Sequence, residues 1–391
     1  MPVTNYKTNE IVLNDSESID YDVILTEGIF DKSNVTIKNY CKDRTFLIVM
    51  SPTVFELYGK EINEYFNYHF EDNKFEIITI PTSEKNKNME NILNICKAGK
   101  DFGLDRKSLM IAIGGGILMD MVGFAASMYK RKMNYIKIPT TLVGQIDAGI
   151  GIKTGINFYE SKNFLGSYHP PIAALNDVNL LKTLDKVDIL CGLAEIIKMA
   201  IVRDEKLFEL IENNHKELIE FNFQKNKLVS SEVNQLSILR MLEELHGNLH
   251  EHVLARLVDF GHTFSPFIEV YTDYKVPHGI AVALDIAIST EIMYLKDGIT
   301  KENRDRILNL LFDTGLKIYH EESYETKFMW ESLEGILLHR GMDLNLVVPT
   351  GIGKATFIKS IDDLNINLLE KALSNLKMIM DANLNKQEVL V

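Results

Sequence analysis

Four polar side chains in the second half of the chain are of types that bind metals and move protons. Glu195 and Lys198 stand three residues apart in Gly-Leu-Ala-Glu-Ile-Ile-Lys, so a helix would present both on one face. His262 follows in Asp-Phe-Gly-His-Thr-Phe, and His278 follows in Pro-His-Gly. One carboxylate and two imidazoles suit Zn²⁺, which in catalytic sites keeps an open fourth position. Spacing alone leaves open that the histidines, two of ten in the chain, are structural.

A second histidine cluster competes for a metal. His246 and His250 have the i, i+4 spacing of a helix face, and His252 follows them. Glutamates flank the cluster, and this composition is equally typical of a solvated helix face. We favour the solvated interpretation of this cluster.

A glycine turn lies at residues 114–120, with the sequence Gly-Gly-Gly-Ile-Leu-Met-Asp. It follows an apolar run that ends at Ile113 and precedes the helical stretch Met121–Tyr129. A strand, a glycine turn and a helix N-terminus together present free backbone N–H groups to a phosphate. The spacing departs from GxGxxG, and glycines also serve tight turns that need positive φ. The motif alone therefore leaves a dinucleotide site and a plain turn both open.

The segment from Ile138 to Pro171 combines polar side chains with glycines, where a backbone can approach a ligand closely. This composition favours a ligand-binding segment, and the alternative is a polar surface loop. Its polar residues include Thr140, Thr141, Asp147, Lys153, Asn157, Lys162, Asn163 and His169.

Hydrophobic periodicity predicts the elements that must hold these residues. Between residues 46 and 141, apolar runs alternate with longer segments of helical spacing, which predicts βαβ units and a parallel sheet. From about residue 185 the pattern changes to amphipathic stretches such as Ala194–Asn213 and Lys227–Glu244, which predict a helical second domain. The apolar runs are Phe46–Met50, Phe75–Ile80, Leu109–Ile113 and Tyr135–Ile138.

Two shorter features complete the predicted architecture. A β-rich passage at Leu346–Val348 and Thr356–Ile358 encloses a glycine-containing turn. Extended stretches at Glu10–Leu13 and Tyr21–Leu25 predict a hairpin on the first domain. No internal repeat or low-complexity tract is visible in the sequence.

Length and composition bound the class of protein. A chain of 391 residues predicts roughly two domains of about 150 residues each. The formal charge of -13 argues against a nucleic-acid partner. The chain has no uninterrupted apolar run of roughly 18 residues and no signal-like N-terminus, so we expect a cytoplasmic protein without a membrane partner. The three cysteines are widely spaced, and we expect them to be reduced packing residues.

Taken together, in order and spacing, these segments resemble the sugar phosphate cyclases, the superfamily of 3-dehydroquinate synthase, over roughly Phe46 to Ile358. The resemblance implies an α/β fold: an N-terminal Rossmann-like, parallel-sheet NAD-binding domain at residues 1–184 and a C-terminal, mostly α-helical metal- and substrate-binding domain at residues 185–391. It also implies an active site between the domains, NAD, Zn²⁺ or Co²⁺, a sugar phosphate substrate and a homodimer.

The resemblance also implies roles for individual residues. The implied metal ligands are Glu195, His262 and His278. The implied substrate-contacting and catalytic residues are Asp147, Lys153, Lys162, Asn163, Lys198 and Asp259. The implied NAD contacts are Glu84, Lys87, Gly115, Gly116, Asp120, Thr140, Thr141, Asp147, Lys162, Thr183 and Leu184.

Departures from 3-dehydroquinate synthase indicate the substrate. In that enzyme the corresponding segment resembles Asn-Phe-Gly-His-Thr-x-Gly-His, whereas this chain has Asp259 in place of the asparagine and Pro266 in place of the last histidine. Ile280 stands where a glutamate is expected. An aspartate for an asparagine and the loss of an imidazole disfavour a substrate with its own carboxylate. These segments of the chain, together with Leu245 and His339, resemble those of the cyclases that act on sedoheptulose 7-phosphate. Among these cyclases they look most like the 2-epi-5-epi-valiolone synthases.

The resemblance implies a phosphate-eliminating lyase in which NAD is recycled. Sister cyclases that give 2-epi-valiolone or desmethyl-4-deoxygadusol share the catalytic set and remain alternatives, as does 3-dehydroquinate synthase. A metal-dependent alcohol dehydrogenase and an inactive NAD sensor are more distant alternatives. One mismatch concerns the adenosine end of NAD, because Ser51 stands where the family often has an aspartate.

Overall fold

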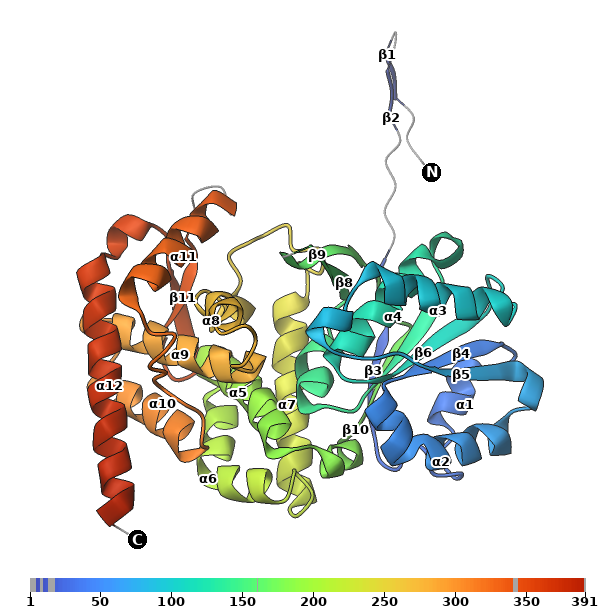
Figure 1. The fold of residues 1–391 in the computed structure, drawn as a ribbon, viewed down its shortest axis with the longest axis horizontal. Helices are drawn as coiled ribbons and strands as arrows, with labels where there is room; N and C mark the ends of the chain where they lie inside the picture. The colour runs from blue at the N-terminus through green and yellow to red at the C-terminus, as the bar shows by residue number, and fades with distance from the viewer. Residues whose placement is uncertain (1–4, 8–9, 13–17, 160, 340–343, 390–391) are drawn as a thin grey trace.

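The computed structural model describes residues 5–7, 10–12, 18–159, 161–339 and 344–389. A sheet-containing half and a helical half lie side by side along the long axis of the molecule (Figure 1). The first half is built on a six-stranded parallel sheet of order β3-β10-β7-β6-β4-β5. Its strands are β3 (Asp22–Thr26), β4 (Phe46–Met50), β5 (Phe75–Thr79), β6 (Leu109–Gly114), β7 (Asn134–Pro139) and β10 (Ala173–Asp177).

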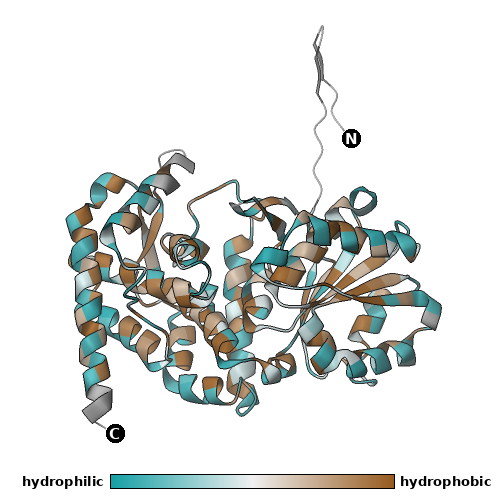
Figure 2. Ribbon diagram, in the orientation of Figure 1, coloured by the Kyte–Doolittle hydropathy of each residue, from teal (hydrophilic) through white to brown (hydrophobic). Residues whose placement is uncertain are grey.

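Helices cover both faces of this sheet, which explains why its central strands are continuous apolar runs. In β4, Phe46, Ile48 and Met50 pack in one core while Leu47 and Val49 pack in the other. The first core includes residues of α1 (Thr36–Cys41) and α2 (Pro52–His69), and the second includes residues of α3 (Met89–Asp101) and α4 (Gly116–Met128). Figure 2 shows the strands as brown, apolar ribbons between these helices. The predicted parallel α/β sheet is confirmed.

The predicted N-terminal hairpin is wrong, because its two strands pair with other strands. β1 (Asn5–Lys7) pairs with β2 (Glu10–Val12), whereas β3 joins the main sheet parallel to β10. Leu13, at the end of the predicted strand, lies outside the described residues. Pairing with β10 sets Asp22 opposite Ala173, a distant partner that local pattern does not reveal.

The second half is helical, as predicted, with one β-hairpin. The expected helix over Ala194–Asn213 is interrupted at Asp204, because this side chain accepts a hydrogen bond from the backbone N–H of Leu207 at 3.1 Å and so starts a new helix. The helices are α5 (Lys186–Arg203), α6 (Glu205–Glu220), α7 (Lys227–Leu245), α8 (Ser265–Tyr271), α9 (His278–Leu295), α10 (Lys301–Asp313), α11 (Thr326–His339) and α12 (Ile366–Val389). The hairpin, as predicted, joins β11 (Leu346–Gly351) to β12 (Lys354–Ile358).

Helix α9 lies in the middle of the helical half and crosses α5 closely. A Cβ atom on Gly279 would lie 2.3 Å from the Cα atom of Cys191, so only glycine permits this crossing. Among the described helices, α9 alone is long and apolar enough to cross a membrane, but 72% of it is buried inside the protein. Its hydropathy is that of a core helix.

The polar segment after β7 is not a surface loop. It forms a π-helix (Gly144–Ala148) followed by an antiparallel hairpin of β8 (Lys153–Phe158) and β9 (Ser161–Tyr168). Three apolar residues in and around the π-helix, Leu142, Ile146 and Ile150, belong to the core of the helical half. This segment therefore ties the two halves together, while the predicted domain boundary between residues 184 and 185 stays a prediction.

Candidate active site

Glu195, His262 and His278 lie together although they are far apart in the sequence. One ligand atom from each of the three lies within 4.8 Å of the others, and this is the one such group of His, Cys, Asp and Glu in the described part of the chain. Glu195 comes from the middle of α5, His262 from the turn before α8, and His278 from the first residue of α9. The α5–α9 crossing therefore brings two of the three side chains together.

The ring nitrogens of both histidines are arranged for metal binding. Nδ1 of His262 is 3.0 Å from the carbonyl oxygen of Phe260, and Nδ1 of His278 is 2.8 Å from a carboxylate oxygen of Glu269. These partners favour a proton on Nδ1 of each ring and leave both Nε2 atoms facing Glu195, at 3.6 and 3.2 Å. Metal-binding histidines usually have such an outer partner.

Glu195 has the environment of an ion ligand. Its carboxylate is fully buried, and neither oxygen accepts an aligned hydrogen bond from the described residues, although Nζ of Lys198 lies 2.5 Å from Oε2. Burial opposes ionisation, but the charges of Lys198 and the two histidines outweigh it and hold the pKa of Glu195 well below its usual value. A divalent cation would satisfy this buried charge, so the three residues fit a Zn²⁺ ion.

The two imidazoles differ in their pKa. Burial and the charge of Lys198 lower the pKa of His262. Burial also opposes the charge on His278, but Glu195 and Glu269 raise its pKa to about 10. The second carboxylate on His278, Glu269, and the charge of Lys198 beside His262 together account for the difference.

Two predicted catalytic carboxylates lie near Lys198. Burial disfavours the charge on this amine, yet Glu195, Asp147 and Asp259 together raise its pKa. Asp147 is in the π-helix and Asp259 precedes the turn to His262, so residues from both halves act on one buried lysine. The predicted group of Asp147, Lys198 and Asp259 is therefore electrostatically connected to the metal group.

A cluster of ion pairs surrounds Asp259, and its members Arg256 and Glu251 were missed from the sequence. The guanidinium of Arg256 forms two contacts with its carboxylate, at 2.5 and 3.2 Å, and also pairs with Glu251. Glu251 in turn pairs with Nζ of Lys153 at 2.9 Å, and Lys153 is 61% exposed. The only sequence signal for Arg256 was its position three residues before Asp259. Lys153 is the more exposed of the two cations and can contact an anionic group.

The glycine turn forms a cradle for a phosphate. Gly115 precedes the first residue of α4 and offers no side-chain cap, so the backbone N–H groups of this helix N-terminus are available to a ligand. A Cβ atom on Gly115 would lie 3.1 Å from the Thr141 side chain, and one on Gly116 would lie 3.1 Å from Ala148. Thr140 lies alongside and donates its backbone N–H to the carbonyl oxygen of Gly114 at 2.9 Å. These residues fit the pyrophosphate of NAD.

Other predicted NAD contacts form a second cluster next to the hairpin. Nζ of Lys87 donates to Asp120 at 2.6 Å and to Asn163 at 2.5 Å. Glu84 accepts from Nδ2 of Asn157 at 2.8 Å and lies 3.5 Å from Nζ of Lys162. The structure therefore brings the predicted NAD contacts Glu84, Lys87, Asp120 and Lys162 together with Asn163, which was predicted to contact the substrate.

Thr183 and Leu184 lie at the end of the 3₁₀ turn after β10, which follows the same edge of the parallel sheet as the glycine turn after β6. The hydroxyl of Thr183 hydrogen-bonds that of Tyr58 in α2 at 2.8 Å. Ser51 caps α2, because its Oγ accepts from the N–H of Val54 at 3.2 Å. These positions stay predictions for the adenosine end.

Two further residues were missed from the sequence. Glu269 joins His278 to Lys162: one of its carboxylate oxygens contacts Nδ1 of His278, and the other accepts a hydrogen bond from Nζ of Lys162 at 2.7 Å. Lys137 is fully buried on β7 and donates to the carbonyl oxygens of Ala148 and Gly151, and burial lowers its pKa to about 8. A lysine within the apolar run Tyr135–Ile138 was the available signal for Lys137, because a buried lysine needs partners.

The competing cluster remains on the surface. His246, His250 and His252 are all exposed, and the ring of His250 lies 5.3 Å from Tyr168 and 5.9 Å from His252. They do not belong to a three-ligand group of the described residues. Leu245 packs against the helical core, and the side chain of His339 lies outside the described part of the chain.

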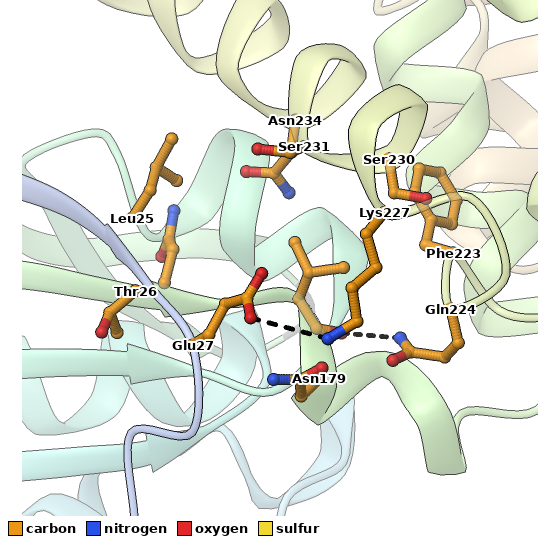
Figure 3. Close-up of a pocket in the computed structure, with 12 residues that line it drawn as sticks. Leu25, Thr26, Glu27, Asn179, Phe223, Gln224, Lys227, Ser230, Ser231 and Asn234 are labelled. Carbon is orange, nitrogen blue, oxygen red and sulfur yellow. Dashed lines mark hydrogen bonds and ion pairs between the residues drawn. The ribbon is translucent and has the colours of Figure 1, made fainter. Parts of the chain in front are cut away.

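A cavity of about 290 Å³ lies away from these residues, between the ends of β3 and β10 and helix α7 (Figure 3). Glu27 and Lys227 approach each other beside it at 3.5 Å. None of the predicted site residues lines this cavity. The cavity is therefore separate from the predicted site residues.

Comparison with known families covers most of the chain. Residues 77–191 match the model of 3-dehydroquinate synthase N-terminal, and residues 192–334 match that of 3-dehydroquinate synthase C-terminal. A 2-epi-5-epi-valiolone synthase from Streptomyces glaucescens is 42% identical over 91% of this chain and 91% of its own. A demethyl-4-deoxygadusol synthase from Trichormus variabilis is 35% identical over 92% of this chain and 88% of its own.

A solved structure is similar over nearly the whole chain. ValA, a 2-epi-5-epi-valiolone synthase from Streptomyces hygroscopicus subsp. jinggangensis with NAD⁺ and Zn²⁺ bound, superimposes with a TM-score of 0.88 at 36% identity. The match covers 94% of this chain and 99% of that one. The glycine cradle and the three-ligand group described above have the donor atoms that these two groups require.

Proposed function

The chain belongs to the 3-dehydroquinate synthase family, and from that premise we propose that it converts sedoheptulose 7-phosphate to 2-epi-5-epi-valiolone and phosphate, using NAD and Zn²⁺. One observation carries the proposal. The group of Glu195, His262 and His278, in which the carboxylate is buried and the two imidazoles are partly exposed, is surrounded by the lysines and carboxylates that such a reaction needs. Relatives that share this product name are 36 to 42% identical to the chain.

Each bound group has a defined place and contribution. Gly115, Gly116 and Thr140 would hold the cofactor's phosphates, and the three-ligand group would hold the metal. When bound, NAD supplies reversible hydride removal from a substrate hydroxyl, and the metal supplies positive charge beside the substrate's oxygens.

The protein's own residues then position the substrate and move protons. Asp147 and Asp259 can accept hydrogen bonds from substrate hydroxyls near Lys198. The buried ammonium of Lys198 can stabilise negative charge that develops on a substrate oxygen, because it acts in a site shielded from water. The exposed cation of Lys153 would contribute to binding the phosphate before and after it leaves.

The identity of the substrate rests on the relatives and on Asp259. Arg256 is already paired with the side chain of Asp259 through two contacts, so it is less available to a carboxylate on the substrate. A phosphorylated sugar without an acid group fits better, which disfavours 3-dehydroquinate synthase activity. The sister cyclase that makes demethyl-4-deoxygadusol remains the second candidate, because a relative with that name is 35% identical.

Further properties follow as parts of the same proposal. The enzyme would be a phosphate-eliminating lyase, a cytoplasmic homodimer without nucleic-acid or membrane partners, and would accept Co²⁺ in place of Zn²⁺. The formal charge of -13 supports the absence of a nucleic-acid partner.

The direct test is phosphate release from sedoheptulose 7-phosphate by the zinc-loaded protein with NAD⁺, with the product identified by NMR. We expect stoichiometric phosphate, the spectrum of 2-epi-5-epi-valiolone and no accumulation of NADH. A different cyclitol would assign the chain to a sister branch. Steady NADH accumulation would instead indicate a dehydrogenase.

A further inference from the structure

We propose that Glu269 is a positioning residue that links the metal ligand His278 to the hairpin residue Lys162, so that metal affinity depends on the hairpin. The proposal rests on the metal site of the proposed function, but its readout is metal binding rather than turnover. Nothing in the sequence motifs or the family resemblance assigned a role to Glu269.

Both carboxylate oxygens of Glu269 are used, each by a different half of the molecule. Glu269 is in α8 and is only 4% exposed. Its Oε1 accepts from Nδ1 of His278 at 2.8 Å, and its Oε2 accepts from Nζ of Lys162 at 2.7 Å. Lys162 is 107 residues away in the sequence, so this link exists only in the folded protein.

The hydrogen bond between Glu269 and Nδ1 of His278 fixes the orientation of the other ring nitrogen of His278, Nε2. Because Glu269 holds the Nδ1 side of the ring, Nε2 faces Glu195, 3.2 Å away, where it can bind a metal. His262 has a different outer partner, the neutral carbonyl of Phe260. Of the two imidazole ligands, only His278 therefore depends on a charged outer partner, which also makes its ring a stronger donor to a metal.

The link to Lys162 extends the arrangement to the cofactor side. Lys162 lies 3.5 Å from Glu84, so acidic and basic groups alternate from Glu84 through Lys162, Glu269 and His278 to Glu195. Removing Lys162 would leave Oε2 of a nearly buried carboxylate without its cation, and Glu269 would then hold His278 less firmly. A contact in the hairpin would thus alter the metal site without touching a ligand.

The first test measures the Zn²⁺ dissociation constant by competition with a chromophoric chelator. We expect Glu269→Gln to raise this constant about 10-fold and Glu269→Ala about 100-fold, the range found for outer partners of metal-binding histidines. The matched control is Glu291→Gln, because Glu291 is a buried glutamate on α9 that contacts Arg304 and Asn375 instead of a ligand. Its Zn²⁺ affinity should equal that of the wild type. Wild-type Zn²⁺ affinity in Glu269→Gln would overturn the proposal.

The second test is a double-mutant cycle that combines Lys162→Met with Glu269→Gln. Lys162 is partly exposed, so the single variant Lys162→Met keeps the proposal testable if the Glu269 variants fold poorly. We expect Lys162→Met to weaken Zn²⁺ binding several-fold in the wild type and to have no further effect in Glu269→Gln. Unchanged Zn²⁺ affinity in Lys162→Met, or equal effects in both backgrounds, would refute the link.

A failure of the metal site itself gives a different result. If the wild type and His262→Ala bind Zn²⁺ equally weakly, the three-ligand assignment is wrong, and with it the metal part of the proposed function. If the wild type and the Glu269 and Lys162 variants all bind one Zn²⁺ equally tightly, and His262→Ala does not, the three-ligand assignment holds and only the positioning role is wrong.

Discussion

Replacing Lys198 with methionine should destabilise the metal-free protein much more than the zinc-loaded protein. In the metal-free protein, Lys198 is the cation nearest to the carboxylate of Glu195, at 2.5 Å, and the two side chains are 2% and 0% exposed. Methionine has a similar volume to lysine but no charge. The variant therefore leaves a buried carboxylate without its closest partner.

The magnitude follows from the burial of this pair. Breaking a buried ion pair by removing one partner typically costs about 3 to 5 kcal/mol, because the remaining charge stays desolvated. In the zinc-loaded protein the ion would neutralise Glu195, so we expect only about 1 kcal/mol, the usual cost of a volume-conserving change. The difference between the two conditions reports the charge on Glu195.

The pH of the assay follows from the same contact. The folded-state pKa of Glu195 lies well below its ordinary value of 4.5. A lowered acid pKa contributes stability above the unfolded pKa, and the contribution is lost as pH falls through the folded pKa. The measurement therefore belongs near neutral pH, where the carboxylate is charged in both states.

The assay is urea unfolding of wild type and variant, each with a chelator and with Zn²⁺. Arg203→Met is the matched control, because Arg203 lies on the same helix as Lys198 and pairs with Glu244 of α7, but is 41% exposed. A pair this exposed should contribute at most about 1 kcal/mol, with or without zinc. An equal loss of stability in Lys198→Met under both conditions, or a loss no larger than that of Arg203→Met, would refute the reasoning.

Three further predictions concern the ligands, a buried acid and the helix crossing. His262→Ala should lose bound Zn²⁺ and turnover, while calorimetry shows NAD binding close to that of the wild type; full activity would remove the metal assignment. Burial raises the pKa of Asp285 from 3.8 to about 6, so folding stability should fall by about 2 kcal/mol relative to Asp285→Asn as pH rises from 4 to 6; an equal change in the free energy of unfolding of the two proteins across this range would contradict it. Gly279→Ala should cost about 1 to 3 kcal/mol or more, because its Cβ would overlap the backbone of Cys191; an unchanged melting temperature would show that α5 and α9 can move apart.

The sequence was sufficient for features that depend on local pattern. The apolar runs of β4 and β6 predicted buried parallel strands, because alternate residues must fill a core on each face. Family order and spacing predicted the group of Glu195, His262 and His278, which the fold brings within ligand distance.

Features that depend on distant partners were missed. Whether β3 pairs with β2 or with β10 is decided by a strand about 150 residues later, and alternation in one strand carries no such information. Arg256 and Glu269 are ordinary charged residues in sequence, and their roles come from Asp259, Lys162 and His278 after folding. Asp204 shows a different limit, because a capping side chain stops a helix that periodicity alone would continue.

The spacing of Lys198 and Glu195 has a consequence for how the chain reaches its folded state. Lys198 is on the next turn of the same helix as Glu195, whereas the two histidines lie more than sixty residues later in the chain. Local contacts form with little loss of chain entropy, while those to the histidines require the closure of long loops. We therefore expect the lysine to neutralise the carboxylate as α5 forms and enters the core. The histidines then complete a site whose most costly charge is already balanced.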